Sequence, residues 1–332
     1  MEHQYYLEFE RPLAELRKKI EEMKKMAAEK NMDISDEIVA LESKAETMRT
    51  DIYRNLTPWQ IVQIMRHPKR PKTFDYVNLI FTDFKEMHGD RSFGDDKALI
   101  GGLAKLDGAP VMVIGLQKGK DTKENIYRHF GMAQPEGYRK ALRLMKFAEK
   151  FSLPVITFID TDGAFPGLEG EERGVAEAIA RNLLEMARLK TPIIISITGM
   201  GGSGGALGIG VGDRVLMMKY GTYSVISFEG AAAILWKDAS RASDAAKALK
   251  PTAKDLLEIK VIDEIIEEPV EGAHTDYEFA AKKLKEALVK NLNELMKIPV
   301  KRLLADRYEK FRNMGIYTKT AGVKNGNEQT GA

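Results

Sequence analysis

The chain has 332 residues, a formal net charge of +2 and 44% hydrophobic residues, as expected for an ordinary globular protein of one or two domains. It contains no cysteine, which excludes disulfides and a cysteine nucleophile, and its five histidines show no local metal-ligand spacing. Neither the charge nor any apolar run points to nucleic acid or a membrane span, and no signal peptide is evident. We therefore expect a cytoplasmic protein with no metal, no membrane association and no specific nucleic-acid partner.

Apolar residues recur every three or four positions across residues 11–56, which predicts helices. The intervening segment 31–36 has the composition of a turn and a helix cap. We expect a helical hairpin with a coiled-coil-like seam within residues 1–57, and so short a seam should pack on the main domain or on another subunit. The basic segment 66–71 is expected to be a solvated loop rather than a phosphate site, and residues 74–87 an amphipathic helix.

The pattern from residue 98 onward alternates apolar strands with helices, which predicts an α/β architecture with ligands at the strand ends. A unit of helix, apolar strand, glycine-rich loop and helix recurs at 137–190 and 175–212. The polar residues 318–332 are expected to form a disordered tail. The expected strands are 98–106, 111–116, 154–159, 193–198, 214–219 and 222–227, and the expected helices are 137–151, 171–189, 229–237, 253–259, 279–296 and 301–311.

Eight of the 28 glycines lie within the fourteen residues 199–212, directly after the apolar strand 193–198. Glycine permits positive φ and close approach to the main chain, and a strand that passes into a helix presents unpaired N–H groups at the helix N-terminus. Such donors suit a phosphate or an oxyanion that exists only during a reaction. A tight packing turn without a ligand is the structural alternative.

Three chemical interpretations of this glycine stretch compete. Residues 201–205 match G-x-S-x-G, but a hydrolase would need His274 as its base, and Ser203 is otherwise a helix N-cap. A nucleotide-binding loop lacks support because the Lys-Ser/Thr ending of a Walker A motif is missing. An oxyanion hole that acts on a group carried by a substrate fits the scarcity of histidine best.

Several long motifs, in order from about residue 5 to about residue 317, resemble the carboxyltransferase α subunit of bacterial-type acetyl-CoA carboxylase. The motifs that carry the resemblance are Gln117–Gly119 with Thr122–Lys123, Phe130–Met132, Pro135–Leu142, Phe158–Thr161, Gly163–Gly167, Glu171–Gly174, Gly201–Leu207, Tyr223–Ser227 and Ile234–Lys237.

The resemblance implies a crotonase-type (ClpP/crotonase-like) α/β fold, a spiral of β-β-α units, over residues 58–317. It also implies transfer of a carboxyl group from carboxybiotin to acetyl-CoA, which gives malonyl-CoA for fatty acid synthesis. Biotin would arrive on a separate biotin carboxyl carrier protein after its carboxylation by biotin carboxylase. A β subunit, in an α2β2 heterotetramer or a larger assembly, would bind acetyl-CoA.

By the same resemblance, the N–H groups of Gly204 and Gly205 form the oxyanion hole for biotin. The other residues expected to bind substrate are Gly163, Ala164, Phe165, Gly201, Gly202 and Ser203. The chain departs from the family pattern at four positions, where Asp162 replaces a proline, Met200 an acid, Phe228 a proline and Ala232 a cysteine.

Two groups of alternatives remain open. The chain could serve another biotin-dependent acyl-CoA carboxyltransferase or decarboxylase, or act alone as a crotonase-type acyl-CoA enzyme. From a different class, it could be a non-catalytic scaffold for the β subunit, although a scaffold has no need of the glycine loops.

Overall fold

The computed structural model describes residues 5–30 and 32–316, and the predicted tail 318–332 lies outside the described residues. Its centre is an eight-stranded sheet in the order β1-β2-β3-β4-β5-β6-β8, in which β7 also pairs with β5. The first three strands are antiparallel to one another, and all pairings from β3 onward are parallel. The strands are β1 Thr82–Glu86, β2 Leu99–Leu106, β3 Ala109–Leu116, β4 Val155–Thr161, β5 Ile193–Gly202, β6 Arg214–Met218, β7 Thr222–Ser224 and β8 Glu264–Ile266.

Helices cover both faces of the sheet, so the central strands β4 and β5 are buried along their whole length. Alternate side chains enter different cores: Ile195 packs with α6 and α8, whereas its neighbour Ile194 packs with α4 and α13. This two-sided burial explains why the β4 and β5 sequences are apolar runs rather than alternating ones. The covering helices are α4 Thr73–Ile80, α6 Pro135–Lys150, α8 Val175–Arg188 and α13 Tyr277–Leu295.

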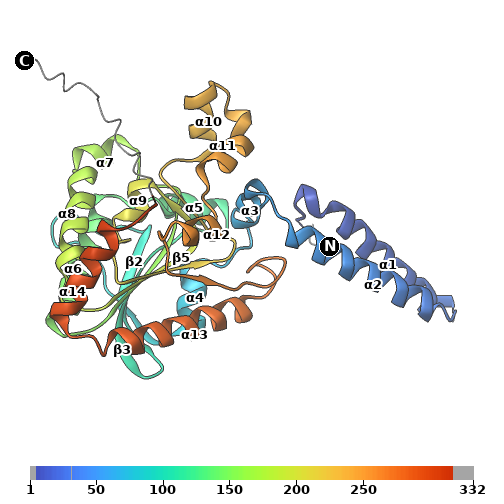
Figure 1. Ribbon diagram of the computed structural model, residues 1–332, viewed down its shortest axis with the longest axis horizontal. Helices are drawn as coiled ribbons and strands as arrows, with labels where there is room; N and C mark the ends of the chain where they lie inside the picture. Colours follow the sequence, from blue (N-terminus) through green and yellow to red (C-terminus); the bar gives the residue numbers. More distant parts are fainter. Residues whose placement is uncertain (1–4, 31, 317–332) are drawn as a thin grey trace, which may run out of the picture.

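Most of the remaining helices lie around the carboxyl ends of the strands or beyond the sheet, whereas α14 packs beside α8 (Figure 1). Within the described part of the chain, no helix is both long and apolar enough to cross a membrane. These helices are α3 Pro58–Met65, α5 Thr122–Tyr127, α7 Leu168–Glu172, α9 Ser203–Leu207, α10 Phe228–Trp236, α11 Ala242–Leu249, α12 Ala253–Glu258 and α14 Val300–Arg312, with short 3-10 turns η1 Glu8–Glu10, η2 His129–Gly131 and η3 Ala239–Arg241.

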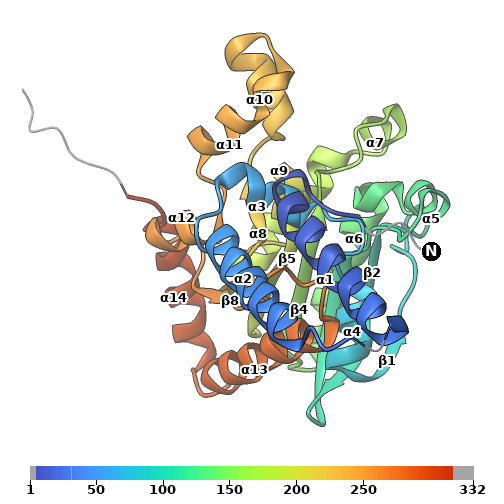
Figure 2. The ribbon, with the colours of Figure 1, turned by 90° about the vertical axis from the view of Figure 1, so that its right-hand side faces the viewer.

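The predicted helical hairpin is present as α1 Arg11–Lys30 and α2 Ser35–Arg54, which we call the arm. Figures 1 and 2 show the two helices side by side, projecting away from the sheet. Leu13, Ile20 and Ala45 are buried in their shared seam. At the base of the arm, Arg17 donates two hydrogen bonds of 2.7 and 2.8 Å to Glu271 of the main body.

Three local predictions were wrong. The helix expected over 74–87 ends at Ile80, because Thr82–Glu86 pairs with β2 as an antiparallel strand. The helix expected over 171–189 is interrupted by Gly174, whose φ of +78° separates α7 from α8. The basic segment 66–71 is not simply a solvated loop, because Arg70 is 1% exposed and donates to Glu268 at 2.7 and 2.8 Å.

Candidate functional site

The predicted site lies where β4 and β5 end side by side. β5 continues to Gly202, beyond the strand expected from the sequence, and Thr161 of β4 is in register with Gly201. The chain then turns directly into α9. The fold therefore brings the glycine turn 201–205 against the loop 162–165, as expected for ligand-binding loops at the carboxyl ends of parallel strands.

Close backbone packing explains two of the glycines in this turn. A Cβ atom at Gly202 would lie 2.3 Å from the carbonyl oxygen of Asp162, and one at Gly205 would lie 2.2 Å from the carbonyl carbon of Gly163. No side chain fits at either position without moving the neighbouring loop. Gly204 differs, because a Cβ there would meet only the Cδ1 atom of Ile179, at 3.7 Å. Packing therefore does not require glycine at position 204.

The N–H groups of Gly204 and Gly205 belong to the first turn of α9. Groups in the first turn of a helix have no carbonyl partner within that helix. The Gly204 carbonyl itself accepts a hydrogen bond of 3.0 Å from the Gly208 N–H, which closes the short helix on its other side. The turn therefore has the form expected of a main-chain donor site for developing negative charge.

Ser203 adopts a φ of +49°, which is unusual for a residue with a side chain. The expected helix cap is wrong: Gly202 occupies the cap position, and no side-chain cap hydrogen bond forms. The histidine required by the hydrolase interpretation is engaged elsewhere, since the His274 ring stacks on His67 with centroids 3.7 Å apart. Within residues 5–30 and 32–316, Ser203 has no hydrogen bond to a histidine.

An apolar pocket of about 340 Å³ borders the glycine turn. Ser203 and Gly204, both predicted site residues, contribute to its wall. The other walls come from α9, β6, β7, α12 and α14 and from residues that follow these elements, and none of them was predicted as a site residue, although Leu207 and Tyr223–Val225 lie in the family-like motifs. Those walls include Leu207, Val215, Tyr223, Val225, Leu256, Val261, Phe311 and Met314.

Phe165, another predicted site residue, does not line the apolar pocket. Its backbone N–H donates to the Ala133 carbonyl at 3.0 Å, and its ring lies 5.1 Å from the His129 ring. Gly163 and Ala164 contact the glycine turn instead, through the close approach at Gly205. The structure therefore groups Gly163 and Ala164 with the turn and places Phe165 at the edge of that group.

A second hollow, which we call the polar cleft, has a volume of about 410 Å³ and begins at Met200, on the same stretch of β5. Inside it, the Lys118 ammonium lies 3.2 Å from Asp160 and 3.4 Å from Asp162. Burial disfavours the Lys118 charge, but the two carboxylates outweigh that cost and raise its pKa. Asp160 also accepts a 3.0 Å hydrogen bond from the Met200 N–H. Lys118 and Asp160 lie in the family-like motifs, but they were not predicted as site residues.

Three of the four departures from the family pattern occupy one apolar cluster. Met200, Phe228 and Ala232 pack together with residues of α3 and α11. The Phe228 ring also lies edge-on to Trp59, with centroids 6.5 Å apart. These substitutions therefore form a single packed set beneath α10 and α11. Asp162 is the exception, because its side chain is 51% exposed at the rim of the polar cleft.

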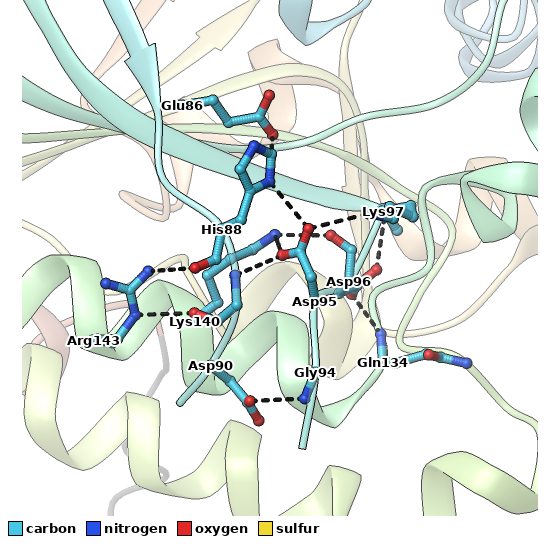
Figure 3. A network of polar contacts seen from close by, with 12 residues as sticks. Glu86, His88, Asp90, Gly94, Asp95, Asp96, Lys97, Gln134, Lys140 and Arg143 are labelled. Atoms are coloured by element: carbon cyan, nitrogen blue, oxygen red, sulfur yellow. Dashed lines mark hydrogen bonds and ion pairs between the residues drawn. The ribbon is translucent and has the colours of Figure 1, made fainter. Parts of the chain in front are cut away.

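A network of charged groups supports the site from outside (Figure 3). The Lys140 ammonium donates to Asp95 at 2.6 Å and to the Asp96 carbonyl at 2.8 Å. The Asp96 carboxylate accepts the N–H groups of Ala98 and Gln134 at 2.6 and 2.8 Å. Because Gln134 immediately precedes α6 and follows the carbonyl that binds Phe165, this network fixes the segment on which the 162–165 loop rests.

Burial raises the pKa of Asp96 to about 7, although the two backbone donors and Lys140 oppose the shift. Partial burial acts to raise the pKa of Asp95, but the hydrogen bonds that Asp95 accepts from Lys140, from the Gly89 N–H and from Lys97 hold that pKa well below its usual value. Among the described residues, no group of three or more histidine or acidic side chains could hold a metal ion.

The chain is similar to known proteins over nearly its whole length. Residues 6–315 match the model of the family described as acetyl co-enzyme A carboxylase carboxyltransferase-like. The chain is 59% identical to the acetyl-coenzyme A carboxylase carboxyl transferase subunit alpha of Geobacter metallireducens, over 96% of this chain and 100% of that one. It is 58% identical to the subunit of the same name from Anoxybacillus flavithermus, over 95% and 97% of the two chains.

Solved structures show the same fold at low sequence identity. Transcarboxylase 12S aligns with a TM-score of 0.56 and 17% identity, over 76% of this chain and 43% of that one. A Pseudomonas malonate decarboxylase hetero-tetramer aligns with a TM-score of 0.53 and 19% identity, over 65% and 86%. The crotonase-type fold expected from the sequence is confirmed. The chain belongs to the family of acetyl-coenzyme A carboxylase carboxyltransferase α subunits.

Proposed function

We propose that this α subunit transfers a carboxyl group from carboxybiotin, borne by a biotin carboxyl carrier protein and produced by biotin carboxylase, to acetyl-CoA. The product is malonyl-CoA, the first committed intermediate of fatty acid synthesis. The observation that carries the proposal is the glycine turn, where the first-turn N–H groups of α9 lie beside the apolar pocket. Family membership supports the same reaction.

In the proposed mechanism, Gly204 and Gly205 donate their N–H groups to the ureido oxygen of biotin as negative charge develops there. Preorganised donors of this kind stabilise a charged transition state without reorganisation. Gly163 and Ala164 hold the turn in place by close packing, and Gly201, Gly202 and Ser203 set its path. Bound biotin would supply the ureido group that carries the carboxyl, and the β subunit would supply acetyl-CoA. As the bond between the ureido nitrogen and the carboxyl breaks, that nitrogen would take one proton from the methyl group of acetyl-CoA, and the methyl carbon would bond to the carboxyl.

The partner is a β subunit in an α2β2 assembly in the cytoplasm. Exposed apolar side chains support a contact beside the site, because Ile234 and Leu235 of α10 are 73% and 60% exposed and Val225 is 74% exposed. The arm, which falls within the predicted N-terminal division 1–57, is proposed to pack against another subunit. Residues 58–317 form the proposed carboxyltransferase domain.

An assay of malonyl-CoA formation tests the proposed reaction. We expect no turnover by this chain alone and robust turnover after assembly with a cognate β subunit, a biotinylated carrier and biotin carboxylase. Activity of the single chain would contradict the division of labour. If the assembled enzyme carboxylates only a longer acyl-CoA, the proposed substrate is wrong but the proposed class of reaction is correct.

Two substitutions at Gly204 test the oxyanion role. Gly204→Pro removes one N–H donor, whereas Gly204→Ala keeps it, and the open space at this position admits either Cβ. We expect Gly204→Pro to lower turnover by about 10²–10³-fold and Gly204→Ala to lower it far less. Circular dichroism and assembly with the β subunit check folding. If both folded variants lose the same amount of turnover, the N–H group of Gly204 is not part of the oxyanion hole.

Gly205 does not offer an equally clean test. Its Cβ would lie 2.2 Å from the carbonyl carbon of Gly163, so any substitution displaces the neighbouring loop as well as altering the donor. A loss of activity in a Gly205 variant would therefore combine a packing effect with an electrostatic one. The comparison at Gly204 separates the two.

A further inference from the structure

The polar cleft contains one cation whose charge is not matched. Lys72 precedes α4, lines the cleft and is only 9% exposed. Across residues 5–30 and 32–316, its ammonium group makes no hydrogen bond or ion pair. The other cations of the cleft are paired: Lys120 lies 2.5 Å from Asp75, and Arg66 lies 2.6 Å from Glu229. Lys72 is therefore the exception in a cleft of otherwise neutralised charges.

The buried charges of the cleft do not cancel. Lys72 and Lys118 share one buried carboxylate, Asp160, whose charge acts on both ammonium groups. Asp162 contacts Lys118 but is half exposed at the rim, where water screens its charge. Burial lowers the pKa of Lys72, and the charges of Lys118 and Arg70 add to that effect, which Asp160 and the part-buried Asp75 offset only in part. The buried set of two ammonium groups and one carboxylate thus carries an excess positive charge.

Neutral hydrogen-bond donors line the same space. The side-chain oxygen of Asn125 accepts the Gly119 N–H at 2.9 Å, so its amide NH2 is left to donate. The Ser227 hydroxyl accepts the Gly230 N–H at 3.2 Å, which leaves its proton available. Together with Lys72, these groups provide donors from three separate segments of the chain. An excess positive charge surrounded by donors is suited to an oxyanion.

We propose that the polar cleft binds an oxyanion group of a substrate, with Lys72 as the principal ligand and Asn125 and Ser227 as neutral donors. The assignment rests on the proposed carboxyl transfer, because the substrates of that reaction carry two kinds of oxyanion. One is the carboxylate carried on biotin, and the other is a phosphate of the acyl-CoA. The cleft is lined by Met200 of β5, three residues before Ser203 of α9, which lines the apolar pocket beside the glycine turn.

Binding is measured first on the full chain alone, without turnover. Nuclear magnetic resonance of ¹⁵N-labelled lysine side chains follows the Lys72 ammonium during addition of inorganic phosphate or bicarbonate at constant ionic strength. We expect saturable shifts of the Lys72 signal and of the signal of Lys118, which lines the same cleft. The variants have no Lys72 signal, so Lys118 reports their binding: its shift should be lost in Lys72→Met and restored in part by Lys72→Arg. The matched control is Lys123→Met, which removes an exposed lysine close to the cleft and should leave the shift intact.

The assembled enzyme then identifies which oxyanion the cleft accepts. In the reverse direction, Lys72→Met should raise the KM for malonyl-CoA about tenfold while kcat changes less, and Lys123→Met should change neither. Malonyl-pantetheine lacks the nucleotide phosphates. If the penalty vanishes with that substrate, the cleft binds a phosphate of CoA; if it persists, the cleft binds the transferred carboxylate.

The proposal is overturned if neither anion produces a saturable shift, or if a folded Lys72→Met chain binds both anions as tightly as the original. Failure of the carboxyl-transfer reaction is a separate result, because the binding measurement uses no partner and no turnover. If the assembled enzyme is inactive but the Lys72 signal still shifts saturably, the proposed function is wrong and the oxyanion site stands.

Discussion

Lys140 and Lys72 are two buried lysines in opposite electrostatic situations. Lys140, on α6, is fully buried and donates to Asp95 at 2.6 Å and to a backbone carbonyl at 2.8 Å. Lys72, at the start of α4, is almost as buried, but its ammonium group has no hydrogen bond or ion pair in the described part of the chain. The first lies in the network behind the site, and the second lines the polar cleft.

This difference separates a structural charge from one available to a ligand. A buried ammonium without a partner is unfavourable, so a fold retains it where something else supplies the missing interaction. The paired charges around Lys140 fix the start of α6 and, through Ala133, the loop that contains Phe165. The unpaired charge of Lys72 contributes nothing comparable to the frame. The predictions below test the contrast between these two lysines.

The largest effect on stability is expected from Lys140→Met. Removal of the ammonium leaves Asp95 without its closest cation and the Asp96 carbonyl without a donor. We expect the free energy of unfolding to fall by about 3–5 kcal/mol, as is typical when one member of a buried pair is removed. Urea denaturation measures the change.

The control for that variant is Lys146→Met on the same helix. Lys146 is 41% exposed and forms its ion pairs at the surface, so its loss should cost less than about 1 kcal/mol. Equal destabilisation by the two substitutions would mean that the pairing of Lys140 is not what stabilises this region.

The second effect is a pH dependence that arises from Asp96. Its pKa in the folded protein is raised to about 7, so the folded state holds this proton more tightly than the unfolded chain. The stabilisation from that proton is fully present below the ordinary aspartate pKa and is lost as pH rises to about 7, by at most about 1.4 kcal/mol per pH unit.

Asp96→Asn isolates this contribution. The variant cannot titrate at position 96, so its unfolding free energy should fall less between pH 5 and pH 8 than that of the original chain. Asparagine also loses one of the two acceptors for Ala98 and Gln134, so the variant should be less stable overall. Parallel pH profiles for the two proteins would show that Asp96 is ionised throughout this range.

Lys72→Met should act in the opposite direction from Lys140→Met. Replacing an unpartnered buried ammonium by an apolar side chain of similar length should raise the free energy of unfolding by about 1 kcal/mol. The same denaturation experiment, without added anions, measures it. A marked loss of stability in Lys72→Met would show that Lys72 stabilises the fold, as Lys140 is expected to do.

The smallest effect is expected for Ser203→Ala, at the apolar pocket. Ser203→Ala removes no cap hydrogen bond and retains the positive φ, so stability should change by less than about 0.5 kcal/mol and transferase activity should largely remain. Ser203→Gly relieves the strained backbone and should add about 1 kcal/mol. A loss of several orders of magnitude in the rate of folded Ser203→Ala would revive the nucleophile interpretation.

Much of the fold was predictable because the sequence patterns that indicate it involve residues close together in the chain. The arm follows from apolar spacing, the β2–β3 hairpin from Asp107-Gly108, and the buried strands β4 and β5 from their apolar runs. The density of glycines after β5 located the turn, and the motifs around it identified the family that the comparisons confirm.

The sequence by itself therefore determined the arm, the central strands, the family and the position of the glycine turn. Tertiary structure decided that residues 82–86 pair as a strand, since their partner β2 lies beyond an intervening loop. The packing of the glycine turn decided the positive φ of Ser203. The arrangement of the buried side chains decided that the charge of Lys72 is unmatched. The physical reason is that periodicity and turn chemistry act between neighbours in the chain, whereas strand pairing, close backbone packing and the balance of buried charge depend on residues that meet only after folding.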